Sequence, residues 1–209
     1  MDRPIGLVAE PQTREMREMH ETKRRLIMAG LQLMLERGYN GVGIQDLLVE
    51  TGVPKGSFYH HFESKEDFAL QVLDAYVANA HALLDATLSD TSRPPLERVR
   101  NFFEGVRASY AEQGYLGCFM GALGQELSGA SEIFRHKVEG CVGAIAARLA
   151  LCLEEARSRG DLPGTTDPVQ MANVLVDAWE GAAFRTRLVR NGRPLEAVLD
   201  FYFAAVTAR

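Results

Sequence analysis

Apolar residues recur every three or four positions along most of the chain, which is the spacing of one face of an α-helix. No convincing run alternates apolar and polar positions, as a half-buried strand would. The pattern therefore predicts an all-α fold of about nine helices. The last five are expected at 96–111, 118–127, 132–159, 168–190 and 195–207, between segments punctuated by Gly and Pro.

The first part of the chain predicts three compact helices. One ends at Gly38, a second runs from Ile44 to about Gly52, and a third covers 55–62 behind Pro54. Ser64 followed by an acidic residue three positions later is typical of a capping box that opens a long fourth helix. We therefore divide the chain into a head (residues 1–66, including an N-terminal arm) and a helical body (residues 67–209).

The third helix has two different faces. At about 100° per residue, Phe58 and Phe62 share one side and anchor the helix to the core. The other side carries small residues and hydrogen-bond donors: Lys55, Gly56, Ser57, Tyr59 and His60. Such donors contact phosphates and base edges in the major groove of DNA. The adjacent His60 and His61 project about 100° apart, so their proximity does not favour a metal site.

The segment 22–70 resembles the DNA-binding head of the TetR family of repressors in both spacing and residue types. The similarity is carried by Gly38-Tyr39, Ile44-Gln45-Asp46-Leu47, Thr51 through Phe62, and Ser64-Lys65-Glu66. The resemblance implies that Lys55, Gly56, Ser57, Tyr59 and His60 form the DNA-reading surface and that Lys65 holds a phosphate. Where the family usually has a hydroxyl residue opening the second helix, this chain has Gly43, which leaves the N–H groups of Ile44 and Gln45 for a phosphate.

The resemblance also implies a homodimer on a pseudo-palindromic operator, because two heads about 34–36 Å apart read more bases than one. Broad apolar surfaces on the predicted helices 132–159 and 168–190 are candidates for the interface: Val138, Val142, Ile145, Leu149 and Leu153, and Met171, Val174, Leu175, Ala178 and Ala182. Small residues there, such as Gly140, Gly143 and Gly181, suit close helix contact. Burial of these surfaces inside one protomer is the alternative.

Charge is distributed unevenly along the chain. Residues 1–65 carry 9 Lys and Arg against 9 Asp and Glu, whereas residues 66–209 carry 14 against 19 and supply the whole net charge of −5. Local basic clusters such as Lys23-Arg24-Arg25 can therefore still meet phosphates. No run reaches the roughly 18 apolar residues of a membrane span, and residues 1–25 are too polar for a secretory signal. We expect a cytoplasmic protein without membrane contact.

Two segments of the body are candidates for a small-molecule effector site. Residues 115–127 and 179–185 are mostly apolar with few polar groups, as ligand pockets tend to be. Both resemble a branch of the family that responds to electrophiles or reactive acyl thioesters, such as N-ethylmaleimide and acryloyl-coenzyme A. The candidate ligand-binding residues are Cys118, Met120, Gln125, Glu126, Trp179, Phe184 and Arg185. Arg185 and Arg187 are candidates for an anionic ligand group, or are solvated helix-end residues.

Cys118 is the candidate sensing atom. The resemblance places a Gly-Cys pair at the start of a helix, where the helix dipole favours a thiolate and lowers the thiol pKa. The alternative is a buried structural thiol, as we expect for Cys141 and Cys152 in mid-helix. Trp179 has the same two interpretations, pocket wall or core. The spacing of the three cysteines fits neither a zinc site nor a disulfide framework, and we expect no metal or cofactor.

The sequence carries no enzyme motif: it lacks a phosphate-binding glycine loop, a nucleophile elbow and an HExxH pair. It therefore predicts a ligand-responsive transcriptional repressor rather than an enzyme. A helical ligand-binding or scaffold protein without DNA affinity is the alternative, which the glycine at position 43 leaves open.

Overall fold

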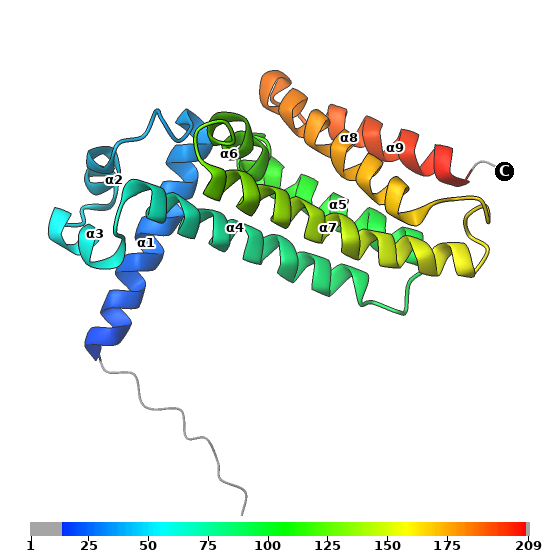
Figure 1. Ribbon diagram of the computed structural model, residues 1–209, viewed down its shortest axis with the longest axis horizontal. Helices are drawn as coiled ribbons and strands as arrows, with labels where there is room; N and C mark the ends of the chain where they lie inside the picture. The colour runs from blue at the N-terminus through cyan, green and yellow to red at the C-terminus, as the bar shows by residue number, and fades with distance from the viewer. Residues whose placement is uncertain (1–13, 208–209) are drawn as a thin grey trace, which may run out of the picture.

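The computed structural model describes the backbone of residues 14–207 and the side chains of residues 19–207. Within this range the chain forms nine α-helices and no β-strand (Figure 1). They are α1 (Arg14–Arg37), α2 (Ile44–Thr51), α3 (Lys55–His61), α4 (Lys65–Leu88), α5 (Pro95–Glu112), α6 (Phe119–Leu127), α7 (Glu132–Ser158), α8 (Pro168–Val189) and α9 (Arg193–Thr207). The predicted all-α fold is confirmed, and the expected N-terminal arm lies largely outside the described residues.

The head and the body are joined by α4. In Figure 1, α2 and α3 lie beside α1 at one end, while α4 begins next to them and runs along the body with α5 and α7. The short α6 lies where the body meets α1, and it contacts both α1 and α7. The predicted domain boundary at 66/67 falls in the first turn of α4, so one helix belongs to both parts.

Local capping chemistry fixes where the longer helices begin. The Ser64 side chain accepts a hydrogen bond from the Asp67 N–H at 3.0 Å, as the sequence predicted, and opens α4. Asp167 caps α8 by accepting from the N–H of Val169 at 3.0 Å, and Pro168 occupies the first turn, where its missing N–H costs nothing. Cys118 is the N-cap residue of α6 rather than its first helical residue.

The core is continuous through head and body. It includes several residues that the sequence analysis had expected at the dimer interface. Ile145, Leu149 and Leu153 of α7 and Leu175 of α8 are buried within the protomer, where α7 packs against α8. These expected interface residues therefore belong to the internal core, because the broad apolar surfaces of α7 and α8 face each other. The side of α7 that faces outward carries Gly140, Gly143, Ala147 and Leu151 instead.

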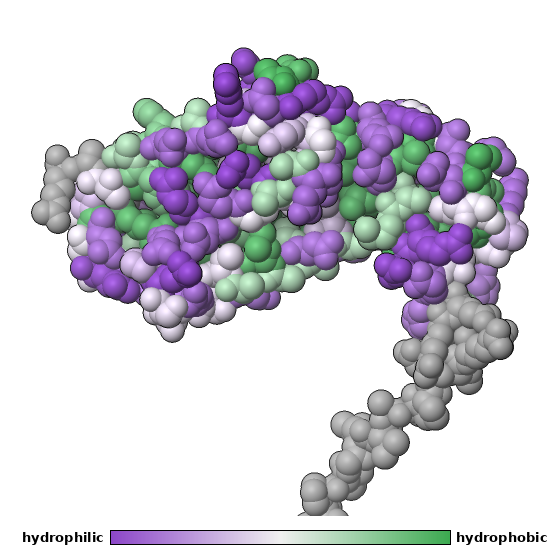
Figure 2. All heavy atoms as spheres, turned by 180° about the vertical axis from the view of Figure 1, so that it is seen from behind, coloured by the Kyte–Doolittle hydropathy of each residue, from purple (hydrophilic) through white to green (hydrophobic). Residues whose placement is uncertain are grey.

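Figure 2 views the side opposite to that in Figure 1, and there hydrophobic residues lie in small patches between hydrophilic ones. Among the described residues, no helix combines the length and the apolar character needed to cross a lipid bilayer.

Candidate DNA-binding face and effector cleft

The turn between α2 and α3 depends on Gly52. Its φ of 65° is left-handed, a conformation that glycine adopts without the steric cost of a side chain. Pro54 follows as the N-cap residue of α3, and its carbonyl accepts from the N–H of Ser57 at 3.0 Å. Arg25 of α1 donates to the carbonyl of Thr51 at 2.6 Å, which holds the end of α2 against α1. The two short helices thus form a helix-turn-helix supported by α1.

Aromatic packing sets the orientation of α3. The Phe58 ring centroid lies 5.1 Å from that of Phe62 and 5.4 Å from that of Phe68, and all three side chains are buried. The opposite side of α3 is consequently turned outward: Lys55, Gly56, Tyr59 and His60 are exposed and Ser57 is half-buried. Gln45 of α2 is also exposed. The predicted faces of α3 are confirmed, and contact with DNA stays a prediction.

Two residues of the predicted DNA-binding set also contact neighbouring parts of the head. His60 places its Nε2 atom 3.2 Å from the sulfur of Met19 in α1. Lys65, the first residue of α4, holds its Nζ 4.1 Å from the centroid of the Tyr39 ring. Partial burial lowers the pKa of Lys65 from its ordinary value. Lys65 therefore packs against the turn after α1 in this conformation, and its contact with a phosphate stays a prediction.

The start of α2 confirms the expected departure from the family pattern. Gly43 is the N-cap residue and supplies no side-chain cap. The Asp46 side chain instead accepts a hydrogen bond from the Gly43 N–H at 2.7 Å. One half of a capping box is therefore present, and the first N–H groups of α2 keep no side-chain partner from position 43.

A cleft of about 430 Å³ opens where α6 and α8 of the body meet the end of α1. Its volume lies in the range of small-molecule sites. The head contributes Arg37 and Gly38, and the body contributes Cys118, Gln125, Glu126, Glu180, Phe184 and Arg187, among others. A second, apolar cavity of about 40 Å³ lies deeper in the body, between aromatic side chains that include Tyr76, Phe103, Tyr110 and Trp179. This inner cavity is too small for an effector in the present conformation.

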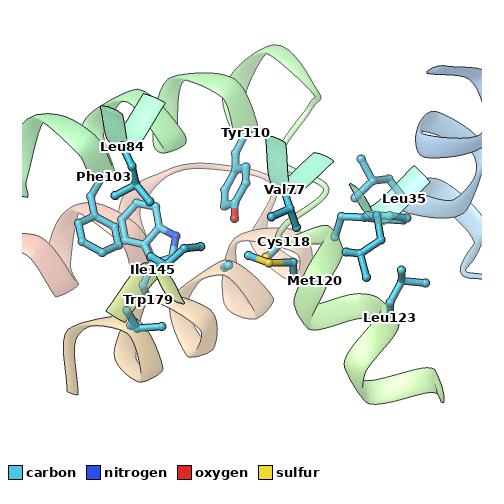
Figure 3. Packing of buried hydrophobic residues seen from close by; sticks show 14 of the residues in the cluster. Leu35, Val77, Leu84, Phe103, Tyr110, Cys118, Met120, Leu123, Ile145 and Trp179 are labelled. Atoms are coloured by element: carbon cyan, nitrogen blue, oxygen red, sulfur yellow. The ribbon is translucent and has the colours of Figure 1, made fainter. Parts of the chain in front are cut away.

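Cys118 and Glu180 line both the cleft and the inner cavity. Figure 3 shows Tyr110 directed toward Cys118, with Phe103 and Trp179 farther along the same core. The Tyr76 hydroxyl approaches the Cys118 sulfur at 3.9 Å. Cys118 and Glu180 therefore lie between an outer cleft with a mixed polar and apolar lining and an inner aromatic cavity.

Burial controls the electrostatics of these two residues. Loss of solvent, and secondly the charge of Glu180, raise the pKa of the Cys118 thiol to about 12. Burial likewise raises the pKa of Glu180 above its ordinary value. The expectation of a lowered Cys118 pKa at a helix start is therefore wrong for this conformation. The N-terminus of α6 still contributes, since the Gly121 N–H lowers the thiol pKa, but desolvation outweighs it.

The predicted ligand-binding residues divide between the two cavities. Met120 and Trp179 line the inner cavity, where the Trp179 ring centroid lies 4.8 Å from that of Phe103. Gln125, Glu126 and Phe184 line the cleft. Arg185 is exposed on the other side of α8 and lines neither cavity, because it lies two residues from Arg187 and so points about 200° away. Arg187, not Arg185, reaches the cleft.

Sequence analysis placed Glu180 inside the candidate segment 179–185 without singling it out, and it missed Tyr110. Glu180 is a carboxylate among apolar residues in the middle of a helix, and this was a signal that the sequence offered. Tyr110 gave no comparable signal, because only the tertiary packing of α5 brings it to Cys118.

Comparison with known proteins assigns the family. Residues 26–72 match the model for bacterial regulatory proteins of the tetR family, and residues 95–202 match the model for a tetracyclin repressor-like C-terminal domain. The chain belongs to the TetR family of bacterial regulatory proteins. It is therefore a regulator of transcription and not an enzyme.

Several named members of the family are similar to this chain along most of their length. The transcriptional regulator AcuR of Cereibacter sphaeroides is 38% identical over 82% of this chain and 79% of its own. The transcriptional repressor DhaR of a Mycobacterium species is 34% identical over 88% of this chain and 91% of its own. The crystal structure of Escherichia coli NemR in its reduced form has a TM-score of 0.78 at 33% identity and covers 88% of this chain and 95% of that one.

Proposed function

We propose that this protein represses transcription as a homodimer that binds a pseudo-palindromic duplex through the exposed face of α3. The observation that carries the proposal is the orientation of α3, with Phe58 buried and Lys55, Tyr59 and His60 turned outward. Hydroxyl, phenol, ammonium and imidazole groups on one short helix suit the phosphates and base edges of a major groove. DhaR and NemR are named as repressors, which supports the sign of the regulation.

The outward side of α7 and α8 supports pairing of two protomers. Gly140 and Gly143 of α7 and Gly181 of α8 let backbones approach closely, and Leu151 of α7 has a side chain that is 73% exposed. Pairing along these helices buries that side chain. It also leaves the heads free to bind two half-sites together.

We further propose that a small electrophile or acyl thioester releases the protein from DNA by occupying the cleft beside Cys118. With an activated alkene, the Cys118 sulfur forms a carbon–sulfur bond to the β-carbon, and the thiol proton ends on the α-carbon. Because the Cys118 pKa is raised, the reaction requires a conformation in which water reaches the sulfur. The similar protein NemR was crystallised in a reduced form, which supports a search for thiol chemistry at Cys118.

A gel-shift experiment with the DNA upstream of the protein's own gene tests the function. The wild-type protein is expected to retard the duplex at low salt, and N-ethylmaleimide is expected to release it. The Cys118→Ser variant is the matched control, which should bind DNA and resist release. Retardation of no upstream fragment would favour a ligand-binding protein without DNA affinity. Equal release of wild type and variant would refute the role of Cys118 alone.

A further inference from the structure

Two charged side chains of the body hold the end of α1 across the cleft. Glu126 of α6 accepts hydrogen bonds from the N–H of Tyr39 at 2.7 Å and from the N–H of Asn40 at 2.6 Å. These N–H groups belong to the turn that leads from α1 to α2. Both hydrogen bonds are charge-assisted, and they are stronger than bonds between neutral groups. One carboxylate of α6 therefore holds the turn after α1 through two hydrogen bonds.

Gly38 permits this approach. Its φ of +77° ends α1, and a Cβ at this position would lie 2.9 Å from Oε2 of Glu126. A side chain at position 38 would therefore displace the carboxylate from this position and strain the backbone. The glycine that predicted the end of α1 from the sequence also makes room for the contact from α6.

Arg187 of α8 makes the second connection. Its Nη1 atom donates to the carbonyl of Leu35 at 2.6 Å and to that of Leu116 at 3.0 Å, and its Nη2 donates to the carbonyl of Glu36 at 3.2 Å. The carbonyls of residues 35 and 36 are among those that the last turn of α1 leaves without helical partners. A guanidinium also interacts favourably with the negative end of the helix dipole. Arg187 thus ties the end of α1 to the segment that precedes Cys118.

Both connections lie in the wall of the same cleft. Glu126 and Arg187 line it together with Cys118 and Ala122, so a molecule that fills the cleft contacts α6, α8 and the end of α1 at once. A shift of α6 away from α8 lengthens the Glu126 hydrogen bonds, the Arg187 hydrogen bonds, or both. Only a ligand that prefers the shifted arrangement changes the equilibrium.

We propose that Glu126 and Arg187 are the coupling residues of this protein, which transmit occupancy of the cleft to the DNA-binding head through the backbone of residues 35–40. The inference rests on the proposed function, in which the cleft receives the effector. It adds the route by which an occupied cleft reorients α2 and α3. Neither residue needs to touch DNA for this role.

The chain offers a matched control for each coupling residue. Gln125 lines the same cleft from the neighbouring position of α6 and makes none of the described hydrogen bonds to the head. Arg185 lies on α8 with an exposed side chain that does not line the cleft. Glu126→Ala is therefore compared with Gln125→Ala, and Arg187→Gln with Arg185→Gln. Each control makes the same kind of substitution at a position whose side chain makes no described hydrogen bond to the end of α1.

In the experiment, a large side chain introduced by substitution in the full-length protein takes the place of an effector in the cleft. Ala122→Trp places an indole in the cleft, and Ala122→Leu is the smaller substitute if the indole prevents folding. Two quantities are measured for each variant. They are the rate of hydrogen exchange of the Tyr39 and Asn40 amides in the free protein and the affinity for the upstream duplex. The exchange readout needs no DNA, so it tests the coupling even if the proposed DNA binding is wrong.

We expect Ala122→Trp to accelerate exchange at Tyr39 and Asn40 and to weaken DNA binding about tenfold, within the usual range of allosteric coupling. The same loss is expected in the Gln125→Ala and Arg185→Gln backgrounds. It should shrink to about threefold or less with Glu126→Ala or Arg187→Gln, because the connection is already broken. Unchanged exchange at both amides, or an equal loss of affinity in all backgrounds, overturns the proposal. Failure of the wild type to bind the duplex refutes the proposed function separately.

Discussion

Substitutions at the neighbouring residues Phe58 and Tyr59 of α3 should change different properties. Phe58→Ala should lower the stability of the protein, whereas Tyr59→Ala should mainly weaken DNA binding. Phe58 is fully buried, and its ring packs against Phe62 and Phe68 with centroid distances of 5.1 and 5.4 Å. Phe58→Ala leaves a cavity and is expected to lower the free energy of unfolding by about 3–5 kcal/mol. That loss is a large share of the roughly 5–15 kcal/mol that stabilise a typical domain.

Tyr59 differs although it is the next residue. Its side chain is 49% exposed, and its ring makes an edge contact with Phe58 at a centroid distance of 5.3 Å. Tyr59→Ala is therefore expected to cost about 1 kcal/mol or less, since little area and one aromatic pair are lost. Removal of the phenol should nevertheless weaken DNA binding, because the side chain lies on the proposed reading face.

Urea unfolding followed by circular dichroism measures the stability of both variants, and fluorescence anisotropy with the upstream duplex measures their DNA affinity. Protein concentration is held fixed, because the stability of the proposed homodimer would depend on it. Equal destabilisation by Tyr59→Ala and Phe58→Ala would refute the orientation of α3 described above. An unchanged unfolding midpoint for Phe58→Ala would also refute that orientation, since the Phe58 side chain would then not be in the core.

Three further changes test other parts of the structure. Because burial raises the pKa of the Cys118 thiol, this thiol should react with N-ethylmaleimide at least about tenfold more slowly in the native protein than in urea at neutral pH, and its rate should rise with pH. Intact mass after timed quenching, compared between the wild type and Cys118→Ser, measures this, and equal rates in the two conditions would contradict the burial. Glu155→Ala removes the ion-pair partner of the buried Arg98 and should cost about 1–3 kcal/mol in urea unfolding, whereas Glu154→Ala, whose partner Arg157 is more exposed, should cost less than about 1 kcal/mol. Leu151→Glu should shift the protein to monomers in sedimentation velocity while its helical signal persists, and an unchanged dimer would place the interface elsewhere.

The parts that could be predicted from the sequence depend on local rules. The two faces of α3 follow from helical periodicity, because Phe58 and Phe62 are four residues apart and must share a side. The ends of α1 and α2 follow from Gly38 and Gly52, whose positive φ values confirm the reason for glycine there. These features need only neighbouring residues, and the family resemblance made them specific.

The parts that could not be predicted depend on contacts between distant segments. Glu126 binds the backbone 86 and 87 residues before it in the sequence, and no local pattern encodes that pairing. The pKa of Cys118 is raised rather than lowered because α4, α5 and α8 bury the thiol. The sequence shows only that the residue lies at the start of a helix. Similarly, only the folded structure shows which side of α8 faces the cleft, and therefore that Arg187 rather than Arg185 lines it.

Site-specific photo-cross-linking tests the central claim most directly. A photoreactive phenylalanine analogue replaces Tyr59 in one sample and Leu151 in another, and each is irradiated in the presence of the upstream duplex. We predict a cross-link from position 59 to DNA and from position 151 to the partner protomer. A cross-link from position 59 to protein alone, or from position 151 to DNA, would contradict the account.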